Sequence, residues 1–206
     1  MQVTLHHISK SFGQEAIIQD MDYVFASQSK TAILGINGSG KSTLLQIIAT
    51  YMKPSKGEVE FKLNGRIIED ENVFQHVSYC APYLEVIEEM NLVEFFEFHF
   101  AFKKPLITIP QIIEQIGLRT SKEKLIENFS SGMKQRVKLA QAIFADTALL
   151  LLDEPCSNLD EEGIALYNLL ISMYTRQKTI IVASNDQQEF SFCESQININ
   201  QFKRAN

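Results

Sequence analysis

Short apolar runs alternate with helical patterns along much of the chain, and this alternation indicates the fold. Residues 31–34, 148–152 and 179–183 form compact apolar segments, which are typical of strands buried in a parallel sheet. The first run leads into a helical pattern that begins near Lys41. A later helix has one apolar face, made by Ile164, Tyr167, Leu170, Ile171 and Tyr174. The pattern therefore predicts an α/β fold with a mostly parallel central sheet.

The N-terminal third departs from this alternation. Residues 1–30 and 58–80 have the composition of short strands. Turn residues separate them at positions 11–14 and at Asn64-Gly65. We therefore expect an antiparallel β part on the N-terminal side of the parallel sheet.

A helical lobe is predicted between the strands of the central sheet. Residues 83–127 are rich in Phe, Ile, Leu and Glu at helical spacing, with breaks at Lys104-Pro105 and Gly117. Residues 132–145 predict one further helix beyond the lobe. The lobe is expected to be an insertion within the α/β part.

Length and charge narrow the class of protein. The chain has 206 residues, enough for one domain with a substantial core, so we expect residues 1–206 to form a single domain with a helical subdomain at about 83–130. Hydrophobic residues make up 45% of the chain, which excludes wholesale disorder. The net charge of −6 argues against direct nucleic-acid binding through charge.

The cysteine spacing, the N-terminal residues and the length of the apolar segments bear on where in the cell the protein is found. Cys80, Cys156 and Cys193 follow neither a disulfide framework nor metal-ligand spacing, which fits a reducing cytoplasm. The N-terminal residues do not resemble a signal peptide, and no apolar segment approaches the roughly 20 residues that span a bilayer. We expect a cytoplasmic protein, and any membrane role must go through a partner.

A glycine-rich motif carries the clearest chemistry. It matches GxxxxGK[ST] between a predicted strand and a predicted helix. Glycines let the backbone N–H groups surround phosphates, Lys41 is suited to reach the β- and γ-phosphates, and Ser42 is suited to coordinate Mg²⁺. The residues expected to bind the nucleotide here are Gly35, Ile36, Asn37, Gly38, Ser39, Gly40, Lys41, Ser42 and Thr43.

Two carboxylates follow the apolar run at 148–152. Ligands of open α/β sheets bind beyond the carboxyl ends of the strands, so Asp153 is suited to hold Mg²⁺. Glu154 is suited to polarise the water that attacks the γ-phosphate. The alternative is that Asp153 and Glu154 form only a solvated turn ended by Pro155. The neighbouring phosphate loop favours a functional role for the pair.

Together these motifs resemble those of the ATP-binding cassette (ABC) ATPases, over nearly the whole chain. Residues 128–136 resemble the family signature, and residues 157–160 are similar to its D-loop. Phe12 stands where the family places an aromatic ring against adenine. The resemblance implies a P-loop NTPase fold of ABC type, with ATP and Mg²⁺ as cofactors.

The signature also has a direct physical interpretation. Ser130 is placed to cap a helix, and the N–H groups of Ser131 and Gly132 would then form a second anion site. A second phosphate cradle is useful only from the opposite side, which implies two copies closing head-to-tail over ATP. The alternatives are an ordinary capped helix here, a routine helix cap at Asn158, and a simple turn aromatic at Phe12.

Several positions depart from the family pattern. The signature has Ser131 and Met133 in place of Gly and Gln, and Pro82 stands where a Gln touches Mg²⁺ and the attacking water. Asn185 occupies the place of a His that contacts the γ-phosphate, and we expect it to act beside Glu154 in catalysis. Because Pro lacks a side-chain donor or acceptor, hydrolysis is expected to be slow. His99 is interpreted as a packing or interface residue.

Two functions remain open at this stage. One is the ATPase subunit of an ABC transporter, which pairs with a second copy or a related ATPase and drives integral membrane subunits, so that it lies at the inner face of the cell membrane. The compact length and residues 131–136 are similar to the haem-exporter ATPase of cytochrome c maturation. The other is a soluble ABC-type switch acting on a protein or nucleic-acid partner. The aromatic residues of the lobe could serve its core or a docking surface: Leu92, Phe95, Phe96, Phe98, Phe100 and Phe102.

Overall fold

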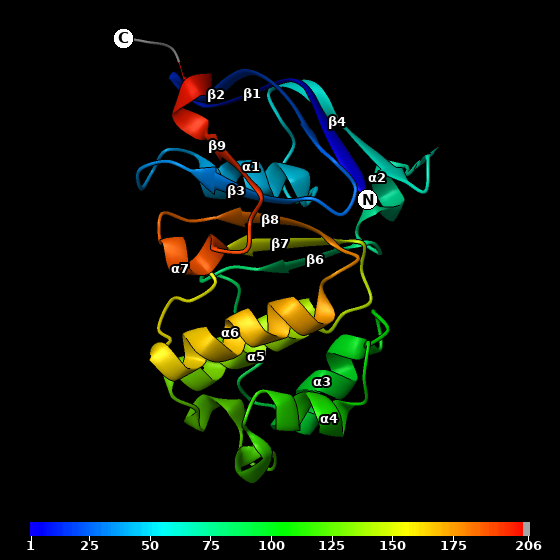
Figure 1. Ribbon diagram of the computed structural model, residues 1–206, viewed down its shortest axis with the longest axis vertical. Coiled ribbons are helices and arrows are strands. Elements are labelled where there is room, and N and C mark those ends of the chain that lie inside the picture. The colour runs from blue at the N-terminus through cyan, green and yellow to red at the C-terminus, as the bar shows by residue number, and fades with distance from the viewer. Residues whose placement is uncertain (204–206) are drawn as a thin grey trace.

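The computed structural model describes residues 1–203, and its strands form two sheets (Figure 1). The antiparallel sheet has the strand order β2-β1-β4-β5. Its strands are β1 (Gln2–Phe12), β2 (Glu15–Phe25), β4 (Lys56–Leu63) and β5 (Arg66–Ile67). The predicted turn at Asn64-Gly65 is confirmed, and both residues have positive φ, as a two-residue hairpin turn requires.

The second sheet is parallel throughout, as the apolar runs predicted. Its strand order is β6-β7-β8-β3-β9. These strands are β6 (Val77–Cys80), β7 (Leu149–Asp153), β8 (Thr179–Ala183), β3 (Lys30–Leu34) and β9 (Ser195–Asn198). Every residue of β6, β7 and β8 is buried, because helices cover both faces.

Helices complete the layers around the parallel sheet. Helix α1 (Lys41–Ile48) lies between the two sheets, whereas α5 (Ser131–Ile143) and α6 (Glu161–Tyr174) cover the opposite face (Figure 1). Two apolar cores result, one around α1 and the antiparallel sheet and one beneath α5 and α6. The short helices are α2 (Asp70–Val73), which the sequence did not predict, and α7 (Gln187–Phe190).

The predicted helical lobe is present between β6 and α5. It contains α3 (Leu92–Phe100) and α4 (Ile109–Gln115), with short 3₁₀ turns at η1 (Arg119–Ser121) and η2 (Ile126–Asn128). A third, η3 (Ile199–Phe202), follows β9.

The aromatic residues of the lobe divide between its core and its surface. Phe95 and Phe96 are buried, whereas Phe98 and Phe102 are 47% and 72% exposed. His99 is half-buried, with Nε2 3.1 Å from the carbonyl oxygen of Gln141. Burial lowers the pKa of His99 to about 4, so it is a neutral packing residue at physiological pH.

Among residues 1–203, none of the helices combines the length and the apolar character needed to cross a bilayer.

Candidate nucleotide site

The predicted phosphate loop connects the end of β3 to the start of α1. Gly35, Gly38 and Gly40 all have positive φ, and Gly40 is the N-cap of α1. A Cβ atom on Gly35 would lie 2.5 Å from Ser39 Oγ, and one on Gly40 would lie 2.5 Å from the side chain of Ile17. Only glycine therefore fits the loop at these two positions.

The loop surrounds a cavity of about 190 Å³. Its lining is formed by Ile17, Asn37, Gly38, Ser39, Gly40, Lys41, Ser42, Thr43 and Glu154. Residues from the loop and from the acidic pair, far apart in sequence, thus meet at one place. The backbone of the loop and the start of α1 are suited to bind an anion there.

The Lys41 side chain reaches back to the start of the phosphate loop. Its side chain is 5% exposed. The Nζ atom donates to the carbonyl oxygens of Gly35, at 2.6 Å, and Ile36, at 3.4 Å. The ammonium group is therefore held against the loop that carries it.

Asp153 ends β7 and is 2% exposed. Burial raises the pKa of its carboxyl, and the nearby Ser42 hydroxyl and Lys41 charge act in the opposite direction. Its Oδ2 atom has no hydrogen-bond partner among the described residues. A buried carboxylate oxygen without a partner is costly, so this oxygen fits a cation ligand. Together with the Ser42 hydroxyl, it forms the oxygen donor set that Mg²⁺ prefers.

Glu154 has an exposed side chain on a constrained backbone. Its φ of 42° lies in the left-handed region, which is uncommon for a residue other than glycine. The backbone is fixed because Glu154 donates its N–H to the Ala183 carbonyl at 3.0 Å. The Ser157 hydroxyl donates to the Glu154 carbonyl at 2.9 Å. The carboxylate is thereby directed into the cavity.

Two buried side chains that the sequence analysis missed support the turn after Glu154. Gln135 Nε2 donates to the carbonyl of Pro155 at 2.6 Å, and the Glu189 carboxylate accepts the N–H of Cys156 at 2.7 Å. Burial raises the pKa of Glu189, whereas hydrogen bonds from Ser184 and Cys156 lower it. No local sequence pattern signals these contacts, because each joins residues distant along the chain.

Asn185 lies beside the phosphate loop, where the switch residue was expected. Its Oδ1 atom accepts the backbone N–H of Gly35 at 3.2 Å. The side chain thus acts as an acceptor toward the loop, a role that the sequence did not indicate.

The second predicted anion site lies outside the cavity of the phosphate loop. Ser130 caps α5, and its Oγ atom accepts the N–H of Met133 at 3.2 Å. Ser131 and Gly132 form the first turn, as predicted. The helix-cap alternative at Asn158 is wrong, because Asp160 caps α6 and Asn158 has a φ of 65°.

Phe12 lies at the end of β1 and is 50% exposed. The Lys10 ammonium lies 5.1 Å from the centre of its ring, a cation–π contact. The structure does not bring Phe12 into the lining of the phosphate-loop cavity.

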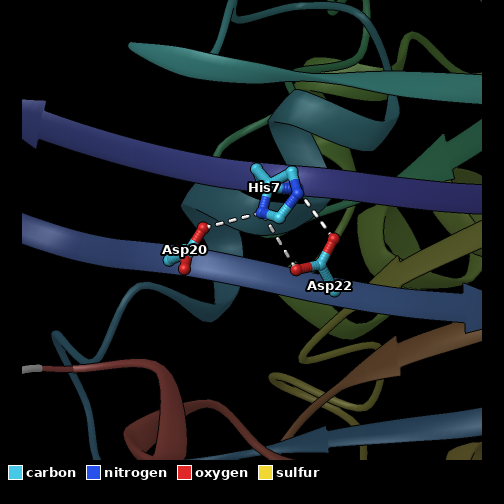
Figure 2. Close-up of side chains that lie close together, drawn as sticks. All are labelled: His7, Asp20 and Asp22. Carbon is cyan, nitrogen blue, oxygen red and sulfur yellow. Dashed lines mark hydrogen bonds and ion pairs between the residues drawn. The ribbon is translucent and has the colours of Figure 1, made fainter.

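A separate polar cluster lies on the antiparallel sheet (Figure 2). The Nδ1 atom of His7 is 2.9 Å from Asp20 Oδ1 and 3.2 Å from Asp22 Oδ2. The hydrogen bond to Asp20 and the two negative charges raise the pKa of His7. All three side chains are exposed, so the ion pairs add little stability. They link β1 to β2 and take no part in the nucleotide site.

Fold and loop together define a P-loop nucleotide-binding protein: a parallel sheet, a glycine-rich turn into α1, and acidic residues at the end of β7. Residues 18–157 match the family described as ABC transporter. The chain belongs to this family and is an ATP-binding subunit of ABC ATPase type.

Curated relatives extend over most of the chain. An uncharacterised ABC transporter ATP-binding protein of Bacillus subtilis, YybJ, is 29% identical over 94% of this chain and 90% of its own length. The Fe(3+) ions import ATP-binding protein FbpC of Pseudomonas fluorescens is 31% identical over 90% of this chain. The chain spans 54% of FbpC and 38% of an ATP-binding/permease protein of Haemophilus influenzae.

Solved structures share the fold. An ATP-binding protein of a putative ABC transporter from Pyrococcus furiosus has a TM-score of 0.83 at 19% identity, covering 99% of this chain and all of that one. The cassette MJ0796, solved as a dimer in a post-hydrolysis state bound to ADP and Pi, has a TM-score of 0.82 at 21% identity, covering 95% of this chain and 93% of its own.

Proposed function

We propose that this chain hydrolyses ATP with Mg²⁺ as one half of a dimeric cassette and drives separate membrane subunits. The observation that carries the proposal is the cavity in which Lys41, Ser42 and Glu154 meet, beside the unpartnered oxygen of Asp153. Residues 1–206 would act as a single cassette, with a helical subdomain at about 83–130.

Different residues would contact the phosphates, the metal ion and the adenine of ATP. The backbone N–H groups of positions 35–43 would surround the phosphates, and Lys41 would bind the β- and γ-phosphates. Ser42 and Asp153 would hold Mg²⁺, which when bound neutralises phosphate charge. The exposed ring of Phe12 offers a platform for adenine.

Glu154 would polarise the attacking water. Its exposed carboxylate lines the cavity, and Ala183 and Ser157 fix its backbone. A general base must be held in position before the reaction begins. The left-handed backbone at Glu154 is consistent with strain kept at a functional residue.

The signature residues Ser130, Ser131 and Gly132 would contact the ATP that a second copy of the chain binds.

Ser130→Arg is expected to leave ATP binding to the monomer nearly unchanged and to block ATP-driven dimerisation, because a bulky cation would obstruct the closing interface. Gel filtration with ATP, together with nucleotide titration, measures both effects. Lys124→Arg, a change in an exposed loop of the lobe, is the control. A Ser130→Arg protein that dimerises and hydrolyses ATP normally would contradict the two-cradle arrangement.

Basal hydrolysis is expected to be slow, because Asn185 is neutral and accepts a hydrogen bond from Gly35. Asn185→His is expected to raise turnover by about 10-fold at nearly constant ATP affinity, since a positioned donor to a developing oxyanion strengthens only the transition state. A neutral imidazole can still accept the Gly35 N–H through its other nitrogen. Steady-state phosphate release measures the change. A lower rate in Asn185→His would show that Asn185 belongs to a rearranged switch.

A membrane partner would dock on the lobe. Phe98 and Phe102 are exposed there, and their rings pack edge-to-face 5.3 Å apart. Co-purification with a protein that has several apolar spans would support a transport role. A chain that instead co-purifies with a soluble protein or nucleic-acid partner would favour the ATP-dependent switch. The haem-exporter subfamily remains a prediction.

A further inference from the structure

Strand β4 has one edge that is only partly covered. On one side β1 pairs with most of β4, whereas on the other side β5 pairs only with Lys62 and Leu63. One further bond follows, in which the N–H of Ile68 donates to the carbonyl of Phe61 at 2.9 Å. Among residues 1–203, no strand pairs with positions 56–60 from that side. This stretch of the edge is therefore open to another strand.

The bond from Ile68 also shows which backbone groups are free. In an antiparallel strand, every second residue turns its N–H and C=O to the same side. The Phe61 carbonyl points away from β1, so the N–H and C=O of Val59 point away from β1 as well. On that side, no backbone hydrogen bond joins Val59 to another described residue. An added strand would bond to Val59 first.

A groove runs along this edge, where α2 lies beside β4 (Figure 1). It consists of two adjoining cavities of about 550 and 520 Å³. Both cavities are lined by Glu58, Val59 and Phe61 of β4 and by Asp70 and Glu71 of α2. Extended peptides bind other proteins by adding a strand to an exposed sheet edge of this kind.

The two faces of the sheet differ along this edge. Val59 and Phe61 face the apolar core under the sheet, where Met52 also packs. Side chains alternate along a strand, so Glu58 and Glu60 project from the opposite face. An added strand alternates in the same way. It would therefore place apolar side chains toward Met52 and Phe61 and polar side chains beside the two glutamates.

The charge of the groove selects the polar side chains of that strand. The lining carries one lysine, Lys53, and five carboxylates: Glu58, Glu60, Glu69, Asp70 and Glu71. Among residues 1–203, Glu60 is the one of the five that forms an ion pair, with Lys62 at 2.6 Å. The other four carboxylates are available to cations from outside the chain, and complementary charge favours such a partner.

We propose that the free edge of β4 binds an extended, positively charged segment of a partner polypeptide as an additional strand. The segment would alternate Lys or Arg with apolar residues, and its backbone would bond to Val59. Its cations would lie beside Glu58 and Glu60 and near α2. The groove shares no lining residue with the phosphate-loop cavity. This binding therefore goes beyond the proposed function and needs no nucleotide.

A fluorescein-labelled peptide of alternating Lys and Val tests the proposal by fluorescence anisotropy, without nucleotide. Two N-methylated forms, one modified at the valines and one at the lysines, each remove alternate backbone donors. An added strand bonds through alternate residues, so at least one form should bind about 10-fold more weakly. Hydrogen exchange at the Val59 amide should slow about 10-fold when the unmodified peptide binds. Equal affinity of all three peptides, or unchanged exchange at Val59, would overturn the proposal.

Glu58→Gln combined with Glu71→Gln tests the charge of the groove. Both side chains are exposed, and an exposed ion pair is worth up to about fivefold in affinity. The double variant should therefore bind the unmodified peptide about 10-fold more weakly. Glu85→Gln combined with Glu89→Gln is the matched control, because these residues are exposed, lie outside the groove and carry the same charge. Equal weakening in the two double variants would show attraction to net charge alone and reject the groove.

Gel filtration tests a second copy of the chain as the occupant of the edge. The proposal expects that adding the unmodified peptide, without nucleotide, leaves the oligomeric state unchanged. A dimer that dissociates when the peptide is added would assign the β4 edge to a second copy and overturn the proposed partner.

Discussion

Lys41→Ala is expected to weaken ATP binding by about 100-fold or more, corresponding to about 2.7 kcal/mol. The change removes the only lysine of the cavity lining and its charge-assisted hydrogen bonds to phosphate. It also removes the contacts from Nζ to the Gly35 and Ile36 carbonyls that brace the loop. Calorimetric titration with ATP and Mg²⁺ measures the loss.

Lys103→Ala provides the matched control for Lys41→Ala. Lys103 is partly buried and also donates Nζ to a backbone carbonyl, that of Val77, at 2.5 Å. It lies outside the phosphate-loop cavity. Lys103→Ala is expected to lower thermal stability without changing the affinity of the folded protein for ATP. Unchanged ATP affinity in Lys41→Ala would show that the phosphate loop is not the nucleotide site.

Glu154→Gln is expected to reduce ATP turnover by about 10²- to 10⁴-fold while ATP still binds. Glutamine keeps the shape and hydrogen bonding of the side chain but cannot accept the proton of the attacking water. The left-handed backbone at Glu154 is unaffected, because the branching at Cβ does not change. Phosphate release measures turnover, and gel filtration with ATP should reveal a trapped dimer.

Glu161→Gln is the control for the charge change at Glu154. Glu161 begins α6 and is exposed, seven positions beyond Glu154 in the chain. Its replacement should leave turnover within about twofold, because exposed substitutions away from a site have small effects. A Glu154→Gln protein that hydrolyses ATP at the unmodified rate would assign catalysis to another group.

The sequence predicted those parts of the fold that depend on local patterns. The apolar runs at 148–152 and 179–183 became the buried strands β7 and β8, because a strand covered on both faces needs no polar alternation. The phosphate loop was predicted because its glycines are required by backbone geometry at Gly35 and Gly40. The cap at Ser130 followed from helix-terminus chemistry.

The parts that escaped prediction depend on contacts across the chain. Gln135 and Glu189 support the turn at Pro155-Cys156 from α5 and α7, and neither position carries a local signature. The helix cap at Asp160 was missed because Asn158 and Asp160 are both good cap residues. In the structure Asp160 Oδ1 accepts the N–H of Gly163 at 2.8 Å, whereas Asn158 has a left-handed backbone.

Helix α5 connects the proposed signature to two turns of the chain. Its 13 residues make a rod about 20 Å long. Ser130 stands at one end, Gln135 holds the turn after Glu154, and Lys138 holds Pro82. Because both side chains belong to one helix, a tilt of α5 would move the carbonyls of Pro155 and Pro82 together. In the proposed dimer, α5 would couple the nucleotide that the partner subunit binds at Ser130 to the turn that follows Glu154.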